Sequence, residues 1–311
     1  MKRTSTVWLA ALLLACRAHA AGFDCGKAVS PAEKQICADA KLSAQDSAMA
    51  DAYAKLLASL PPPLKGIVRH DQRDWIKARD NIVADPRRKA DLATLIQERV
   101  AALKPRRIGT LDFLILRGQS RPPFLLGAAP GQDMFNHWAR KEWGDTVPDE
   151  ADEEDEAPPS ADPDEMRCNE NFTYTVILAS PALLSIGKSG STYCAGAAHP
   201  TAMGEQFNWW LERNKVLAEQ DMFKDKTWRK AVVDNAAAQM DPDRIMDRKT
   251  LDPALLSPAN WQITPKSLHV VIPQDSIFGH AAGQAEADVP WTKLEKLLKP
   301  EFAAALERAG H

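Results

Sequence analysis

The chain has 311 residues, a length that predicts about two domains. Hydrophobic residues make up 45% and charged residues 26% of the sequence, which is ordinary for a soluble globular protein with a core of useful size. The formal net charge of −3 provides no overall basic field, so we expect no nucleic-acid partner.

The first twenty residues have the pattern of an export signal. Lys2 and Arg3 form a basic start, and residues 7–15 are an apolar run too short to cross a bilayer. Ala-His-Ala then places small residues before a cut after Ala20, so we expect a signal peptide over 1–20 and a periplasmic protein. The alternative is a lipid anchor, because the Leu-Leu-Ala-Cys that ends at Cys16 resembles a lipobox. No later stretch is apolar enough to span a membrane.

Four cysteines remain after the expected signal, and an even number in an exported chain predicts two disulfides. Sequence alone allows three connectivities among Cys25, Cys37, Cys168 and Cys194. We favour the near pairs, Cys25 with Cys37 and Cys168 with Cys194, because each then lies within one domain. Free buried thiols are the alternative. We expect no metal and no cofactor, since no cysteine has a CxxC partner or a nearby histidine at ligand spacing.

A helical module follows the signal. Ser30, Pro31 and Glu33 form a capping box that predicts a helix to about Ala38. A second start signal at Ser43 predicts a helix that three prolines at 61–63 stop, and two further helices are expected around residues 64–76 and 92–103. The first helix is too short to be stable alone. A disulfide across the loop before it would contribute roughly 3 kcal/mol in an oxidising compartment.

These residues resemble the LprI-like lysozyme-inhibitor N-terminal domain over about residues 23–104. The resemblance rests on Cys25, on the Glu-Lys-Gln-Ile-Cys that ends at Cys37, on the helix at 42–57, and on Gln-Arg-Asp-Trp-Ile-Lys-Ala-Arg-Asp at 72–80. Members often carry a second cysteine pair, which this sequence lacks. The resemblance implies a helical domain, over 21–104, that binds lysozyme.

The polar residues of the last motif allow two interpretations. Arg73 and Arg79 could be part of a binding surface, or the set Gln72, Arg73, Arg79 and Asp80 could form internal salt bridges that fix helix packing. We favour the salt bridges, and we expect Trp75 to lie in the core.

A second domain is expected from about residue 105 to 311. Residues 144–165 hold eleven acidic residues, four prolines and no basic residue, which predicts a disordered insertion at about 144–166. It is either a solubilising loop or an acidic lure for a cationic partner. Before it, residues 109–118 read as a strand and 132–143 as a helix.

The remaining sequence first has the composition and the apolar–polar alternation of β-strands, and helical segments follow. Strands are expected at 172–180, 182–194, 201–212 and twice within 261–273, with a Gly-Lys-Ser-Gly turn at 187–190. Helices are expected at 227–240, 291–298 and 301–308. Separate runs of strands and helices predict an α+β domain with an antiparallel sheet and packed helices, so the whole chain is α+β with an all-α N-terminal module.

This half resembles the RsiV-like C-terminal domain over about residues 108–300. The words that carry the resemblance are Thr-Tyr-Cys-Ala-Gly-Ala-Ala-His-Pro at 192–200, the run at 208–225, and the segments at 263–273 and 280–294. The resemblance implies recognition of lysozyme or cell-wall glycans, and it does not by itself imply catalysis.

Enzymatic interpretations find little support in the motifs. Gly187-Lys188-Ser189 lacks the first glycine of a P-loop, and neither G-x-S-x-G nor H-E-x-x-H occurs. His199 is the histidine of interest, either as a neutral turn residue or as a hydrolase or deacetylase group that would need Asp221 or Asp275 beside it. We expect no catalytic residue.

We therefore predict a periplasmic, lysozyme-binding protein that protects peptidoglycan. A loop around Lys188, Ser189 and Ser191 is a candidate contact, along with Arg73, Arg79 and His199. The alternatives are an envelope enzyme that acts on glycans and an envelope stress or assembly factor without lysozyme contact. The sequence does not indicate the oligomeric state.

Overall fold

The computed structural model describes residues 21–88, 91–144, 168–279 and 283–310. The chain forms two compact units, Met1–Ala101 and Ala102–His311, which we call unit 1 and unit 2. The expected signal segment and almost all of the expected acidic insertion lie outside the described residues. Within the described part, no helix is both long and apolar enough to cross a membrane.

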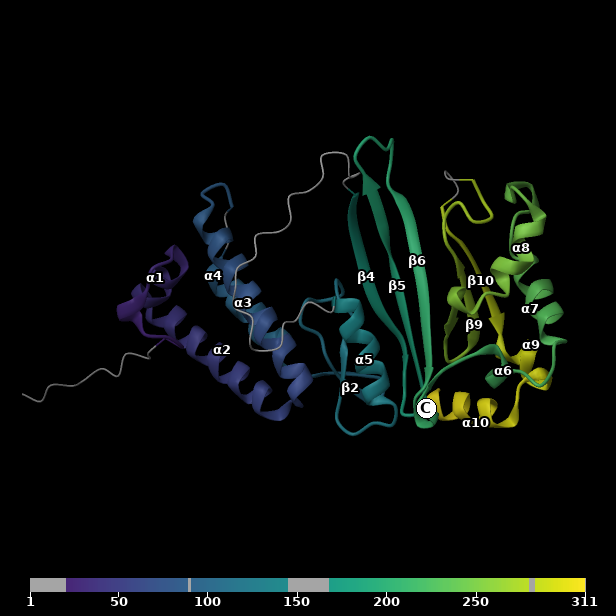
Figure 1. The fold of residues 1–311 in the computed structure, drawn as a ribbon, viewed down its shortest axis with the longest axis horizontal. Helices are drawn as coiled ribbons and strands as arrows, with labels where there is room; N and C mark the ends of the chain where they lie inside the picture. Colours follow the sequence, from purple (N-terminus) through teal and green to yellow (C-terminus); the bar gives the residue numbers. More distant parts are fainter. Residues whose placement is uncertain (1–20, 89–90, 145–167, 280–282, 311) are drawn as a thin grey trace, which may run out of the picture. The chain divides into compact units, whose positions relative to one another are not determined.

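Unit 1 is helical. Its elements are η1 (Cys25–Lys27), α1 (Pro31–Ala38), α2 (Ala40–Ser59), α3 (Pro62–Ala84) and α4 (Leu92–Ala102), as Figure 1 shows. The helices bury one apolar face each, and the fully or almost fully buried side chains include Ile36, Met49, Leu56, Ile67, Val68 and Ile96.

The start of α1 follows the predicted capping box. The Ser30 hydroxyl accepts from the Glu33 N–H at 3.1 Å, and the Glu33 carboxylate accepts from the Ser30 N–H at 3.0 Å. The disulfide Cys25–Cys37 joins η1 to α1, which is the expected pairing.

The start of α2 differs from the prediction. Asp39, not Ser43, is the N-cap, because its carboxylate accepts from the Lys41 and Leu42 N–H groups. Ser43 lies inside the helix, where its buried hydroxyl donates to the Ile36 carbonyl at 2.7 Å. The prolines after α2 also begin the next helix, since Pro62 is the first residue of α3, a position that needs no N–H donor.

Unit 2 is built on three antiparallel sheets. The large sheet has the order β4-β5-β6-β7, and two three-stranded sheets have the orders β1-β2-β3 and β10-β9-β8. The strands are β1 (Arg106–Ile108), β2 (Leu111–Leu114), β3 (Phe124–Leu126), β4 (Cys168–Ala179), β5 (Leu183–Cys194), β6 (Thr201–Trp210), β7 (Lys215–Val216), β8 (Trp261–Ile263), β9 (Ser267–Ile272) and β10 (Ala285–Pro290). The disulfide Cys168–Cys194, also the expected pair, joins directly opposed residues of β4 and β5.

The large sheet lies between two layers of other elements (Figure 1). Each of its faces belongs to a separate hydrophobic core. One face packs on α5 (Gln132–Trp143) and the β1–β3 sheet, and the other on the β8–β10 sheet and helices. Trp209 enters the first core and Trp210 the second, because neighbouring strand residues point to opposite faces. In the part of unit 2 that the structure describes, the further helices are η2 (Leu211–Arg213), α6 (Glu219–Met222), α7 (Trp228–Ala237), η3 (Pro242–Arg244), α8 (Arg248–Leu255), η4 (Pro258–Asn260), α9 (Trp291–Leu294), η6 (Glu295–Leu297) and α10 (Pro300–Ala309).

The predicted turn at 187–190 is wrong. Strand β5 runs without a break through these residues, paired with β4 on one side and β6 on the other. The glycines serve close packing: a Cβ at Gly190 would lie 2.0 Å from the Asn171 carbonyl oxygen, and one at Gly187 would lie 3.0 Å from Gln206. The β4–β5 turn lies at the expected break between 172–180 and 182–194, where the Ser180 hydroxyl accepts from the Leu183 N–H.

Candidate functional site

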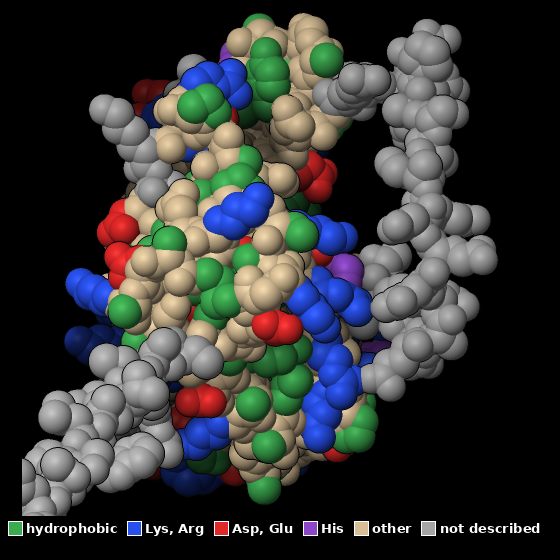
Figure 2. Space-filling view, turned by 90° about the vertical axis from the view of Figure 1, so that its left-hand side faces the viewer, with side chains coloured by type: hydrophobic (Ala, Val, Ile, Leu, Met, Phe, Trp, Pro, Cys, Tyr) green, Lys and Arg blue, Asp and Glu red, His purple; other side chains and the backbone are tan. Residues whose placement is uncertain are grey.

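A row of four cations marks the outer surface of α3. Lys65, Arg69, Arg73 and Lys77 follow one another at intervals of four residues, and residues so spaced form one ridge of a helix. We call this row the basic ridge. Figure 2 shows that Lys and Arg side chains gather in a column on the face of unit 1 that it displays.

Most side chains of the basic ridge are exposed, and several of them form no ion pair with the described residues. Arg69, Arg73 and Lys77 are exposed, and Lys65 is half-buried. Among the residues that the structure describes, neither Lys65, Arg73 nor Lys77 has an ion-pair partner. Arg73 therefore fits the surface interpretation of its motif.

Arg79, the second expected binding residue, lies in the interior instead. Its side chain is 4% exposed, and its guanidinium contacts Asp80 at 2.7 Å and Asp46 at 3.9 Å. Burial raises the pKa of the Asp46 carboxyl above its usual value, although the Gly22 N–H and Arg79 oppose that shift. Arg79 is thus a packing residue of unit 1 and is not available to a partner.

A second buried ion pair joins α3 to α4. Arg99 donates to Asp71 at 2.7 Å and to Gln72 at 2.8 Å, and both charged side chains are 2% exposed. The Trp75 ring lies near the guanidinium groups of Arg79 and Arg99, at 5.5 and 5.8 Å from ring centroid to Cζ. Sequence reasoning missed Arg99, although a charge on the apolar face of α4, beside Ile96, was a usable signal.

The Gln-Arg-Asp-Trp-Ile-Lys-Ala-Arg-Asp motif therefore divides between two sides of α3. Gln72 and Arg79 point inward and hold α3 to its neighbours, whereas Arg73 and Lys77 point outward. The salt-bridge interpretation holds for Arg79, and Arg73 remains a candidate contact.

The expected contact loop of unit 2 does not exist as a loop, because Lys188, Ser189 and Ser191 all lie within β5. The Lys188 ammonium pairs with Glu142 of α5 at 3.0 Å and lies 4.6 Å from the centre of the Phe172 ring. The Tyr174 hydroxyl donates to the same carboxylate at 2.7 Å, and burial together with that bond raises the pKa of Tyr174. Lys188 is consequently held against the sheet and does not protrude.

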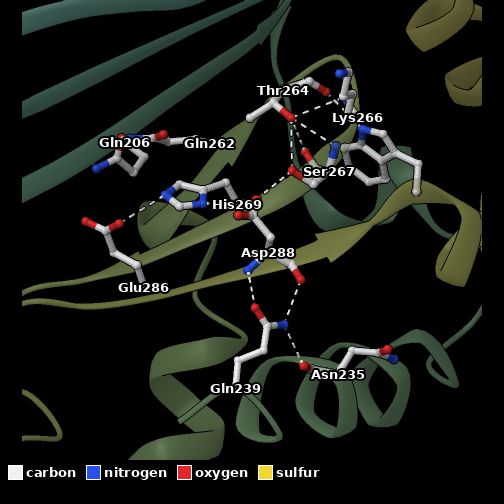
Figure 3. Close-up of polar contacts among 11 residues, drawn as sticks. Gln206, Asn235, Gln239, Gln262, Thr264, Lys266, Ser267, His269, Glu286 and Asp288 are labelled. Carbon is white, nitrogen blue, oxygen red and sulfur yellow. Dashed lines mark hydrogen bonds and ion pairs between the residues drawn. The ribbon is translucent and has the colours of Figure 1, made fainter.

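A polar network surrounds His269 on β9 (Figure 3). Its Nδ1 lies 3.1 Å from Asp288 Oδ1, which also accepts from the Ser267 hydroxyl at 2.7 Å. The Gln239 side chain bonds both the N–H and the carbonyl of Asp288, so it occupies the outer edge of β10 there. His269 Nε2 faces Glu286 at 3.8 Å.

This network does not have the arrangement of a hydrolase triad. In a triad the serine hydroxyl bonds the histidine and the carboxylate holds the other ring nitrogen. Here the Ser267 hydroxyl bonds Asp288, which stands between the serine and the imidazole of His269. Within the described ranges, no group of three or more His, Cys, Asp or Glu side chains could hold a metal.

The three residues considered for a hydrolase centre, His199, Asp221 and Asp275, lie in separate connections and helix starts of unit 2. His199 is exposed in the connection between β5 and β6. Asp221 pairs with Lys215 at 2.7 Å and accepts from the Ala218 N–H, so its carboxylate holds the start of α6. Asp275 lies in a turn after β9, with a positive φ of 62°.

Comparisons with known proteins give one family match and several matches to solved structures. No curated protein matches the chain. A crystal structure of a DUF3298 family member from Bacteroides fragilis matches at 18% identity with a TM-score of 0.37, over 45% of this chain and 58% of that one. A DUF3298 family protein from Pseudomonas aeruginosa PAO1 matches at 19% identity with a TM-score of 0.34, over 44% of this chain and 63% of that one. The chain thus spans less than two thirds of either structure. Residues 25–111, which contain helices α1 to α4 and their disulfide, match the family model described as lysozyme inhibitor LprI.

Proposed function

We propose that the protein binds a lysozyme and inhibits it, and that unit 1 makes the contact. The match of residues 25–111 to the lysozyme inhibitor LprI family carries this proposal. The arrangement of unit 1 supports it, because buried ion pairs such as Asp71–Arg99 hold the helices of the matched segment together. The segment therefore has a complete helical fold that can present a surface.

The same proposal places the protein in the periplasm, where it protects peptidoglycan. Two disulfides, Cys25–Cys37 and Cys168–Cys194, fit an oxidising compartment. The export signal expected over the first twenty residues supports the same location. The RsiV-like resemblance of unit 2 points to the same class of partner.

Inhibition of a lysozyme has a simple physical requirement. Lysozyme hydrolyses glycan with a pair of carboxyl groups that flank the scissile bond. A protein that covers this cleft keeps the glycan out, and groups that donate to the carboxylates hold it there. An inhibitor of this kind needs no catalytic residue of its own.

The test is a titration of the expected exported form, residues 21–311, into hen-type and goose-type lysozymes. Calorimetry measures binding, and the clearing of a cell-wall suspension measures activity. We expect sub-micromolar binding to at least one lysozyme together with loss of clearing. Absence of binding to both would refute the proposal for these classes.

A further inference from the structure

We propose that the basic ridge of α3 is the surface that enters the lysozyme cleft, with Arg73 and Lys77 facing the carboxylate pair. This inference rests on the proposed function and adds to it the contact surface and its chemistry. It replaces the segment around Lys188, which the structure places within β5 and pairs with Glu142.

The shape of the ridge suits a long cleft. Lys65 and Lys77 are twelve residues apart, which is roughly 18 Å along a helix at about 1.5 Å per residue. A glycan-binding cleft is an elongated groove, and a helix laid along a groove is a recurring mode of protein recognition. The helix α3 that carries the ridge has 23 residues.

The charge of the basic ridge is complementary to the carboxylates of a lysozyme cleft. Arg73 and Lys77 are exposed and have no ion-pair partner among the described residues, so both can pair with carboxylates at little cost to the fold. Arginine can bind a carboxylate through two parallel N–H donors. The neighbouring His70 and Asp74 contact each other at 3.4 Å.

The inner side of α3 keeps the ridge in place. Asp71 and Gln72 bind Arg99 of α4, and Arg79 binds Asp46 of α2 and Asp80. These contacts fix the rotation of α3 about its axis, so the backbone under Arg73 and Lys77 is already ordered before a partner arrives. Such preorganisation lowers the entropic cost of binding.

An acidic membrane is the other kind of partner that the basic ridge could bind. Each cation near an anionic lipid surface strengthens binding by roughly five-fold. Loss of one partner from a desolvated charge pair at a protein interface weakens binding by roughly 30-fold or more. Both kinds of partner are therefore sensitive to the ridge charges, so binding to lysozyme and binding to phosphatidylglycerol vesicles are measured separately for each variant.

The experiment compares two double variants of residues 21–311 with the unchanged protein. Arg73→Glu/Lys77→Glu alters the ridge, and Lys34→Glu/Lys55→Glu is the matched control, since both of its lysines are exposed on helices of unit 1 and the charge change is the same. Binding and clearing are measured at about 0.15 M salt, where the Debye length of roughly 8 Å confines charge effects to close contacts. Thermal unfolding checks that each variant is folded.

We expect the ridge variant to lose at least 30-fold in affinity for lysozyme, and the control to stay within about three-fold. A soluble chito-oligosaccharide that fills the cleft should compete with the unchanged protein. In addition, we expect Arg73→Ala to bind lysozyme more weakly than the unchanged protein does. Most of this difference in affinity should disappear when the lysozyme carries an amide in place of a catalytic carboxylate.

Each other outcome overturns the inference in a recognisable way. If the unchanged protein binds lysozyme and the folded ridge variant binds equally well, the ridge is not the contact and the proposed function stands. If the ridge variant loses only binding to phosphatidylglycerol vesicles, the ridge is a lipid surface. If the unchanged protein binds no lysozyme, both the proposed function and this inference fail.

Discussion

At the scale of single residues, the side chains of one short motif have opposite roles. Arg79 is buried against Asp46 and Asp80, whereas Arg73, six residues earlier, is exposed. Residues six positions apart lie on different sides of a helix, but only the partners on α2 and α4 show which side of α3 is inside. The partner Arg99 lies 27 residues after Gln72 in the chain, so no local pattern pairs them.

The buried pair Asp71–Arg99 yields a stability prediction. Arg99→Met leaves the Asp71 carboxylate buried without its cation, so we expect a loss of about 3 kcal/mol in the free energy of unfolding. Urea denaturation measures it, with the exposed Arg73→Met as a matched control that should change stability by less than about 0.5 kcal/mol. Equal, small losses for both variants would show that the pair does not hold α3 to α4.

The capping carboxylate of Glu33 yields a pH prediction. Hydrogen bonds from the Ser30 and Val29 N–H groups lower the pKa of Glu33 below its usual value of 4.5. A lowered folded-state pKa means that the carboxylate stabilises the fold above the unfolded pKa, and that this contribution is lost as the pH falls through the folded pKa. Because the Glu33 side chain is only partly buried, solvent screens this contribution, and Glu33→Ala should cost about 0.5 kcal/mol at pH 7.

The pH dependence of that cost provides the check. Denaturation of both proteins between pH 7 and pH 3 should show the difference shrinking only below about pH 4.5. A difference that stays constant over this range would mean that the Glu33 charge has no part in the cap.

At the scale of elements, glycine explains the largest error in the sequence-based prediction. Gly-Lys-Ser-Gly has turn composition, yet both glycines lie inside β5, where neighbouring groups approach the backbone closely. Composition cannot distinguish a glycine that supplies a turn from one that gives room to a neighbouring strand. The turn between β4 and β5 contains Pro181 and no glycine.

Gly190 can be tested directly. A Cβ there would lie 2.0 Å from the backbone oxygen of Asn171 and 2.8 Å from the Phe172 ring, so Gly190→Ala must push β4 away from β5. We expect a loss of about 2 kcal/mol or more, seen as a lower midpoint of thermal unfolding. Gly279→Ala is the control, because the nearest group to its Cβ is the Met246 sulfur at 3.9 Å. Equal midpoints for the two variants would contradict the close approach of β4 and β5.

At the scale of the whole molecule, the sequence predicted the class of fold better than the site. Long periodic segments bounded by caps or prolines were placed closely: the expected helices at 31–38 and 132–143 coincide with α1 and α5. The α+β class, with a helical region before antiparallel sheets, is confirmed. The short elements α6 and β7 were missed because four and two residues carry too little periodicity to stand out, and α8 was missed because Pro253 lies inside it.

The candidate site was predicted only in part, for a physical reason. A composition rich in small polar residues suggested an exposed loop at Lys188, but strand pairing on both sides placed it within a sheet. Arg73 was named as a candidate because its motif is local to one helix, and the structure leaves it exposed. The continuous row from Lys65 to Lys77 becomes a surface only when the other side of α3 is known to be buried.

The most direct test of the central claim is a stoichiometric titration of lysozyme activity. A cell-wall clearing assay is run with lysozyme at a concentration well above the dissociation constant, and residues 21–311 are added in steps. We predict that activity falls linearly and reaches its minimum near one molecule per lysozyme. Unchanged activity of both hen-type and goose-type lysozymes at a ten-fold excess of the protein would contradict the account.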